Sequence, residues 1–145
     1  MRQVKFDSKL CLGCLDCETA CALEHSELND LYESINEKSK PLSRLHIKKK
    51  EGKLFLQICK NCKKPRCIET CETGAIYKKD DYVIVDYNRC NGCWECINAC
   101  QFRSIGKDEY RSKIIMCDLC IGRKPSCVNS CITGALKLVE DEDDK

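Results

Sequence analysis

Cysteine is the residue type in this chain with the greatest capacity for chemistry, and its spacing is regular. The 145 residues include 16 cysteines and two histidines. All the cysteines fall into four quartets, with none left over. The quartets are Cys11, Cys14, Cys17 and Cys21; Cys59, Cys62, Cys67 and Cys71; Cys90, Cys93, Cys96 and Cys100; and Cys117, Cys120, Cys127 and Cys131. Groups of soft thiolates select zinc, copper(I) or iron–sulfur clusters over hard cations, so the pattern predicts metal chemistry.

The spacing within the quartets favours iron–sulfur clusters. The first and third quartets follow C-x2-C-x2-C-x3-C, and the second and fourth keep the same start and end around a longer middle. This spacing is typical of [4Fe–4S] binding, where the fourth cysteine of a run can ligate the other cluster of a two-cluster protein. A cube takes four thiolates, so the 16 cysteines suffice for four cubes. The sequence therefore predicts four [4Fe–4S] clusters with every cysteine as a ligand.

Structural zinc and disulfide bonds are the two alternatives for such a chain. Zinc usually takes two C-x2-C pairs separated by a longer loop, and the near-adjacent cysteines of the first and third quartets would crowd a single ion. Disulfides are typical of secreted proteins, but MRQVKFDSKL before Cys11 has no apolar stretch and no twin arginines, so no signal peptide is expected. No stretch reaches transmembrane length. We expect a cytoplasmic iron–sulfur protein, and a zinc-stabilised binding module is the less favoured alternative.

Composition and charge agree with clusters in the interior. Hydrophobic residues make up 43% of the chain, and that count includes the cysteines, so little remains for an ordinary core. The clusters would act as cores, and the metal-free chain should be largely unfolded. Four oxidised cubes with their thiolates, about −2 each, would shift the formal charge from +2 to about −6. The basic residues would then screen a negative interior, and no nucleic-acid partner is expected.

An internal repeat organises the chain. The first and third quartets share C-x-G-C-x-x-C-x-x-A-C, at 11–21 and 90–100. The second and fourth share Lys-Pro-x-Cys before their third cysteine and Thr-Gly-Ala after their fourth. The chain is therefore two copies of a long unit with two cluster motifs each. Gly13 and Gly92 occupy equivalent places, where the backbone must approach a cube closely.

Short strands and helices must hold these cysteines. Residue alternation predicts a β-hairpin in 44–58 that turns at Glu51-Gly52, and a second in 76–86 that turns at Asp80-Asp81. Each third cysteine should be linked to its fourth by a short helix. Further short strands are expected at 113–116, at 135–139 and at 4–6, with the last two paired.

The segment 26–37 predicts an amphipathic helix. Its apolar face should pack against the rest of the protein, and docking of a partner is the alternative. The residues concerned are the cap Ser26 and the apolar Leu28, Leu31, Tyr32 and Ile35.

The quartet pattern resembles the four-cluster, polyferredoxin-type electron-transfer subunits of molybdenum and tungsten oxidoreductases over almost the whole chain. ACALEHSELNDLYESI (20–35) and GCWEC (92–96) resemble the small iron–sulfur subunit of carbon monoxide dehydrogenase/hydrogenase systems. They equally resemble the related subunit of tungsten aldehyde oxidoreductases. Several such proteins replace a cysteine of the third quartet by Trp, but here Trp94 lies between intact Cys93 and Cys96.

The resemblance implies an α+β fold of two nested bacterial-ferredoxin-like modules around four cubane clusters. Residues 1–25 and 107–140 would form the outer module, and 52–106 the inner one. An insertion at 26–51 would hold the amphipathic helix and the start of a hairpin, before an acidic tail at 141–145. Spacing alone also permits linear pairing of the first quartet with the second and the third with the fourth. The implied ligand sets are Cys11, Cys14, Cys17 and Cys131; Cys59, Cys62, Cys67 and Cys100; Cys90, Cys93, Cys96 and Cys71; and Cys117, Cys120, Cys127 and Cys21.

The expected function is that of a non-catalytic electron-transfer subunit in a hetero-oligomer. Single electrons would pass between a catalytic redox subunit and an acceptor such as ferredoxin, a hydrogenase or a pyridine-nucleotide-reducing subunit. The catalytic subunit would be a tungsten/molybdenum aldehyde-type oxidoreductase or carbon monoxide dehydrogenase. No catalytic residue is predicted, because no nucleophile–base pair stands out and no ligand cysteine is missing. His25 is expected to have a surface or structural role. A free soluble polyferredoxin is the alternative, which the 26–51 insertion disfavours.

Overall fold

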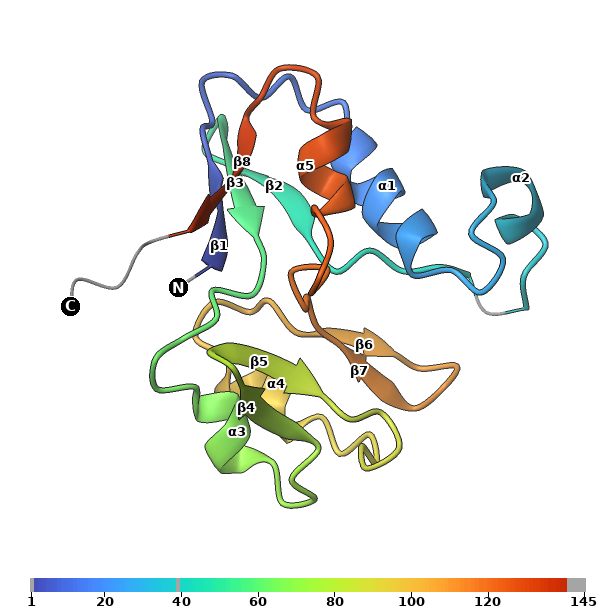
Figure 1. Cartoon of the computed structure of the whole chain (residues 1–145), viewed down its shortest axis with the longest axis vertical. Helices are drawn as coiled ribbons and strands as arrows, with labels where there is room; N and C mark the ends of the chain where they lie inside the picture. Colours follow the sequence, from blue (N-terminus) through green and yellow to red (C-terminus); the bar gives the residue numbers. More distant parts are fainter. Residues whose placement is uncertain (1, 39, 141–145) are drawn as a thin grey trace.

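The computed structural model describes residues 2–38 and 40–140. Short helices and two-stranded sheets alternate along the chain, and Figure 1 shows them in two halves. One half holds both ends of the described chain, and the other holds its middle. The elements are β1 (Arg2–Phe6), α1 (Asp16–Glu24), α2 (Leu31–Ser34), β2 (His46–Lys50), β3 (Lys53–Gln57), α3 (Arg66–Thr70), β4 (Ile76–Lys79), β5 (Tyr82–Val85), α4 (Glu95–Ala99), β6 (Gly106–Asp108), β7 (Lys113–Ile115), α5 (Ser126–Ser130) and β8 (Leu136–Glu140).

The strands pair into antiparallel sheets of two strands each: β1 with β8, β2 with β3, β4 with β5, and β6 with β7. The predicted hairpins are present as β2–β3 and β4–β5, and the predicted pairing of the first strand with the last is present as β1–β8. Asp80 and Asp81 both have positive φ angles, as a tight hairpin turn requires. Strand β6, which has three residues and pairs with β7, was not predicted from the sequence.

Four of the helices carry the third cysteine of a quartet. Cys17 and Cys21 both lie in α1, whereas α3, α4 and α5 each contain the third cysteine and end at the fourth. The expected short helices are therefore present. Helix α1 contacts α5, and α3 contacts α4, so quartets that are far apart in sequence lie side by side.

The predicted amphipathic helix over 26–37 is wrong in its extent. Helix α2 spans Leu31–Ser34 alone, because the Asp30 carboxylate accepts the N–H groups of Tyr32 and Glu33 at 2.9 Å each and caps the helix there. The Ser26 hydroxyl instead donates to Leu23 O at 2.8 Å and accepts from the Asn29 N–H, which forms a turn after α1.

The packing predicted for the apolar face of this segment is also wrong. Tyr32 is 79% exposed and Ile35 is 69% exposed, and Leu28 and Leu31 are exposed as well. In Figure 1, α2 lies at the end of a loop that extends away from the helices and sheets. These side chains do not contribute to the core of the described chain.

Cysteines take part in both groups of buried residues. One group joins Val4, Leu45, Ile58 and Leu136 with four buried cysteines from quartets one and four. The other joins Ile76, Val83, Ile114 and Met116 with two from quartet three. Mixed helix-and-strand architecture is thus confirmed, and both groups of buried residues include thiols. Within the described residues, no helix is long and apolar enough to cross a bilayer. The predicted tail at 141–145 lies outside the described residues.

Candidate metal centres

Three cavities are each lined by four cysteines. One of about 120 Å³ is lined by Cys11, Cys14, Cys17 and Cys131, called set 1 here. A second is lined by Cys59, Cys62, Cys67 and Cys100, called set 2. A third is lined by Cys90, Cys93, Cys96 and Cys71, called set 3. In each, three cysteines of one quartet meet the fourth cysteine of another.

The remaining cysteines form a buried group, set 4, which consists of Cys117, Cys120, Cys127 and Cys21. Burial, followed by the charges of Cys21, Cys120 and Cys17, raises the pKa of the Cys127 thiol to about 12. Burial also raises the pKa of Cys117 and Cys120, and Cys21 adds to both shifts. The structure therefore brings together the four sets that the family resemblance implied. Their role as ligands stays a prediction.

The sets differ in how far they are from solvent. All members of set 4 are buried, and all members of set 2 are half-buried. Set 1 contains the exposed Cys14, and set 3 contains the exposed Cys93. Sets 1 and 3 therefore reach the surface, and set 4 is interior.

The donor groups fit a soft cationic centre. Burial and the charges of Cys59, Cys100, Cys62 and Cys96 raise the pKa of Cys67 to about 12. Burial and the charges of Cys71, Cys93 and Cys90 raise the pKa of Cys96 to about 11. Gathered thiolates repel one another, and a positive metal core relieves that repulsion. A chain that gathers four thiols around one point thus suits an iron–sulfur cube.

The repeated Thr-Gly-Ala motif supplies hydrogen bonds to the fourth cysteines. Burial opposes ionisation of Cys71, but donors from the Thr73 hydroxyl and from the Ile76 and Ala75 N–H groups lower its pKa overall. The Thr73 hydroxyl lies 3.5 Å from Cys71 Sγ, and Thr133 lies 3.7 Å from Cys131 Sγ in the second copy. This role was not predicted from the sequence, although the motif is repeated after both fourth cysteines.

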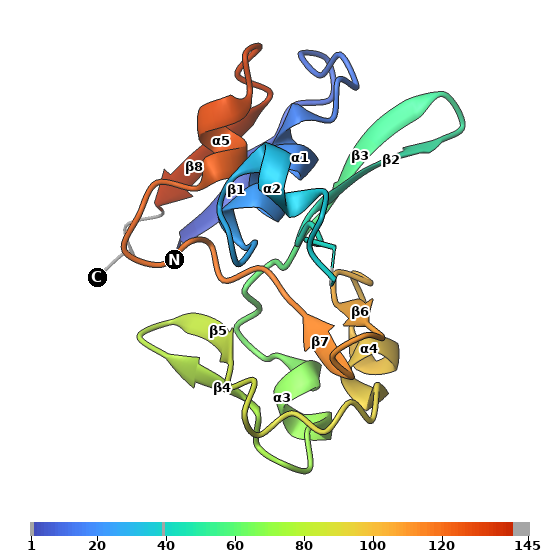
Figure 2. The ribbon, with the colours of Figure 1, turned by 90° about the vertical axis from the view of Figure 1, so that its right-hand side faces the viewer.

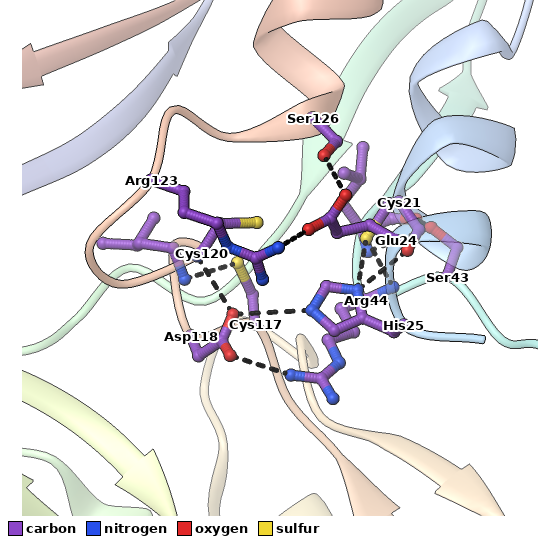
Figure 3. Close-up of polar contacts among 12 residues, drawn as sticks. Cys21, Glu24, His25, Ser43, Arg44, Cys117, Asp118, Cys120, Arg123 and Ser126 are labelled. Carbon is purple, nitrogen blue, oxygen red and sulfur yellow. Dashed lines mark hydrogen bonds and ion pairs between the residues drawn. The ribbon is translucent and has the colours of Figure 1, made fainter. Parts of the chain in front are cut away.

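A polar network surrounds Cys21 (Figure 3). The Nδ1 of His25 donates to the Cys21 carbonyl at 2.8 Å and lies 3.9 Å from Cys21 Sγ. The backbone N–H of Arg44 donates to the same sulfur at 3.3 Å. Asp118 joins the network through Arg44 Nη1 at 3.2 Å and His25 Nε2 at 3.7 Å.

The charges in this network reinforce one another. Burial disfavours the imidazolium of His25, but Asp118 and Cys21 outweigh it and raise the pKa of His25 to about 9. Burial likewise opposes ionisation of Asp118, but His25 and Arg44 lower the pKa of that carboxyl to about 2. His25 therefore has a structural place beside a predicted ligand.

His25, Asp118 and Cys120 also have ligand atoms within 4.8 Å of one another. Asp118 is already paired with the Arg44 guanidinium, whose charge opposes a second cation, and Cys120 belongs to set 4. The three residues are better explained as part of the surroundings of set 4 than as a separate metal site.

Comparison with known proteins yields a family match. The model of the family described as "4Fe-4S dicluster domain" matches residues 51–141. Among curated proteins, the chain is 31% identical over 140 residues to the putative electron transport protein YsaA of Escherichia coli, covering 94% of this chain and 88% of YsaA. It is 30% identical over 151 residues to the electron transport protein HydN of E. coli, covering 92% and 85%.

A larger relative and a solved structure also match. The chain is 34% identical over 140 residues to the β subunit of NADH-dependent phenylglyoxylate dehydrogenase from Aromatoleum evansii, covering 92% of this chain but 29% of that subunit. A chain of the BamBC active site complex of benzoyl coenzyme A reductase superposes with a TM-score of 0.55 at 21% identity, covering 100% of this chain and 82% of the other; this likeness shows the fold. Together the matches confirm the predicted [4Fe–4S] cofactors, and the 16 cysteines fit four of them.

Proposed function

Because the chain belongs to the 4Fe-4S dicluster domain family, we propose that it is a non-catalytic electron-transfer subunit that holds four [4Fe–4S] clusters in a row. The observation that carries the proposal is the gathering of the cysteines into four sets. Sets 1, 2, 3 and 4 are the proposed ligands of one cluster each, in two nested ferredoxin-like modules. Contacts of α1 with α5 and of α3 with α4 support the nesting.

The order of the sets supports a linear route. Cysteines of sets 1 and 4 lie in one group of buried residues, and Cys59 of set 2 packs against that group. Cys59 and other cysteines of set 2 also pack against the second group, which contains Cys90 and Cys96 of set 3. Neighbouring sets thus follow the order 1, 4, 2, 3, with the solvent-reaching sets at the two ends. When bound, the clusters supply one-electron exchange at iron.

The chain's own residues hold and tune these positions. Apolar side chains such as Leu45 and Ile58 exclude water near set 4. The Arg44 N–H and the Thr73 hydroxyl donate toward Cys21 and Cys71, and such bonds shift cluster potentials. We assign no proton transfer or bond-making step to any side chain, in keeping with an electron conduit.

We propose that the partners are a catalytic redox subunit and a separate electron acceptor, in a cytoplasmic hetero-oligomer. The sequence resemblance suggests a tungsten/molybdenum oxidoreductase or carbon monoxide dehydrogenase as the catalytic subunit. Ferredoxin, a hydrogenase or a pyridine-nucleotide-reducing subunit would be the acceptor. The relatives of this chain include a dehydrogenase β subunit and electron transport proteins, which supports such a setting. The exposed apolar side chains around α2 support a subunit over a free carrier, because large exposed apolar patches mark interaction sites.

Metal analysis of the native complex tests this proposal. The tagged chain should be purified anaerobically from its host, and iron, zinc, nickel, tungsten and molybdenum measured. Iron sufficient for four cubes, together with tungsten, molybdenum or nickel from a co-purified subunit, is the expected result. The same amount of iron without a co-purified partner would indicate a free polyferredoxin instead of a subunit. Zinc in place of iron would refute the proposal.

A further inference from the structure

The two ends of the proposed route can be compared position by position, because the internal repeat relates set 1 to set 3. Leu12 and Leu15 of CLGCLDC correspond to Asn91 and Trp94 of CNGCWEC. Ile132, which follows Cys131, corresponds to Glu72, which follows Cys71. Differences at these pairs are therefore differences in surface chemistry on a shared framework.

The set 1 end has an apolar rim. Leu12, Leu15 and Ile132 all line the cavity of set 1, and they are 80%, 45% and 89% exposed. At the set 3 end, the equivalents Asn91 and Glu72 are polar and exposed, and Trp94, the equivalent of Leu15, is half-buried. Exposed leucine and isoleucine around a thiol cavity leave apolar area in water, which indicates a surface that a partner covers.

The same end carries a hairpin with uncompensated positive charge. Ile47 of β2 lines the set 1 cavity, and a Cβ placed on Gly13 would lie 3.8 Å from Leu54 of β3, so the β2–β3 hairpin adjoins the set 1 loop. Figure 2 shows the hairpin extending away from the rest of the chain. Its lysines are exposed and none has an ion pair with another described residue: Lys48, Lys49, Lys50 and Lys53.

The equivalent hairpin at the other end has its charges paired. Lys107 of β6–β7 lies 3.3 Å from Glu109, and it also lies 4.6 Å from the centre of the Trp94 ring. Arg111 pairs with Asp108 at 3.4 Å and with Glu27 at 2.7 Å, and Lys113 donates to the Cys90 carbonyl. Unpaired basic charge beside an apolar rim is thus a property of the set 1 end.

We propose that the set 1 end is the docking site for a separate, acidic electron-carrier protein. Its surface would present an apolar patch ringed by carboxylates over its own redox centre. The apolar rim would meet the patch, and the hairpin lysines would meet the carboxylates. One electron would leave the reduced cluster at set 1, and the carrier's centre would gain it. The inference rests on the proposed function and adds the chemistry of the partner and the place where it binds.

A second copy of this chain is a less suitable occupant. The acidic and apolar segment around α2, with Asp30, Glu33, Leu31 and Tyr32, has complementary chemistry. However, α2 lies at the end of a loop that extends away from the other helices and from the sheets (Figure 1). Electron transfer weakens steeply with distance, so docking through α2 would leave the two chains' redox centres far apart. A carrier whose centre lies directly beneath its patch has no such difficulty.

The test uses the cluster-loaded protein and a purified, strongly acidic two-cluster bacterial ferredoxin as the probe. Binding of the two oxidised proteins is measured by calorimetry, and electron transfer from the reduced chain by stopped flow, both across a salt series. Lys48→Glu with Lys50→Glu should weaken both about tenfold at low salt, and the loss should shrink as salt screens the charges. Leu12→Asn with Ile132→Glu, which copies the other end, should weaken binding at every salt concentration, with a further loss at low salt from the new carboxylate.

The matched control is Lys78→Glu with Lys79→Glu, which makes the same change in net charge on the exposed β4–β5 hairpin. The docking proposal would be overturned if both double lysine variants lost the same affinity for the ferredoxin. It would also be overturned if a basic cytochrome bound more tightly than the ferredoxin. Salt-sensitive self-association that the Lys48 and Lys50 changes abolish would assign the surface to a second copy. Binding of a duplex DNA oligonucleotide with the same sensitivity would assign it to nucleic acid.

Electron exchange with methyl viologen separates this inference from the proposed function. Every variant should still be reduced and reoxidised by this small dye, since it needs no docking surface. A wild-type chain that fails to exchange electrons with the dye would refute the electron-transfer function itself. A chain that exchanges with the dye but shows no preference for the acidic ferredoxin would refute the docking site alone.

Discussion

At the scale of single residues, hydroxyl and amide groups lie within hydrogen-bonding distance of several cysteine sulfurs. Thr73 and Thr133 come from the two copies of Thr-Gly-Ala and lie beside Cys71 and Cys131. Ser104 lies 3.4 Å from Cys100 Sγ. A donor stabilises the more negative, reduced form of a cluster more than the oxidised form, so each such bond should raise a potential.

Thr73→Val should therefore lower the potential of the cluster that set 3 is proposed to hold. The expected change is about 40 mV or less. A hydrogen bond contributes about 1 kcal/mol, and for a one-electron couple about 1.4 kcal/mol corresponds to a potential difference of about 59 mV. Potentials are measured by redox titration followed by electron paramagnetic resonance. Thr73→Ser keeps the hydroxyl and is the control; equal potentials in the two variants would show that the hydroxyl has no effect.

Neither the donors nor the ligand sets could be derived fully from the sequence. The cysteine spacing specifies the type of cluster, because three thiolates must fit one cube. It leaves open which distant cysteine completes each cube, since Cys131 and Cys11 are brought together only by the β1–β8 pairing and the α1–α5 contact. The family resemblance, rather than spacing, supplied that pairing.

At the scale of elements, the β2–β3 and β6–β7 hairpins lie close to the cysteine loops that contain Gly13 and Gly92. Gly13 and Gly92 both have φ of +71°, a conformation that favours glycine. The space around them differs. A Cβ on Gly13 would meet the Leu54 side chain at 3.8 Å, whereas a Cβ on Gly92 would collide with the Ser112 carbonyl on the β6–β7 connection.

Gly92→Ala should accordingly be the more damaging of two equivalent substitutions. Both variants bear the strain of a positive φ, and Gly92→Ala adds a collision with backbone that costs about 1–3 kcal/mol more. Stability is followed as the loss of cluster absorbance near 400 nm during denaturant titration under anaerobic conditions. Equal midpoints for Gly92→Ala and Gly13→Ala would contradict the close approach of the hairpin to the set 3 loop.

Turn residues and apolar spacing predicted most of the helices and strands. They failed in 26–37, where helical apolar spacing and a later helix start lie close together. Tight turns at Glu51-Gly52 and Asp80-Asp81 defined the hairpins, since both positions suit positive φ. In 26–37 the apolar spacing was helical, but Asn29 with φ of 49° and the Asp30 cap start the helix later. Strand β6 has too few residues to show alternation.

At the scale of the whole molecule, cysteines lie where the two halves of the chain meet. Cys59 packs against both groups of buried residues, at the point where sets 4 and 2 adjoin. Because cysteines belong to both groups, both would lose packing without the clusters that these cysteines are proposed to hold.

Removal of the clusters should therefore unfold the chain. Anaerobic chelation of iron after oxidation should abolish the cooperative thermal transition and the far-ultraviolet circular dichroism of the folded state, since metal binding supplies folding free energy. Reconstitution with iron and sulfide should restore both signals. A metal-free chain that still melts cooperatively would show that the apolar residues suffice for the fold.

The proposed ligand sets can be tested by counting clusters in variants of set 1. Cys14→Ala and Cys131→Ala should each lose one cluster, and the double variant should also lose only one, because both cysteines line the same cavity. Iron and sulfide analysis gives the count. Loss of two clusters in the double variant would favour linear pairing, in which Cys14 and Cys131 serve different cubes.

The pairing of β1 with β8 and of α1 with α5 also has a consequence for the order in which the protein can mature on the ribosome. Under the proposed ligand sets, residues 59–100 contain every ligand of sets 2 and 3, so these two clusters could be inserted while the rest is still being made. Sets 1 and 4 combine the earliest cysteines with the latest. The first quartet to be synthesised would thus wait longest with free thiols, and oxidation during synthesis would threaten it most.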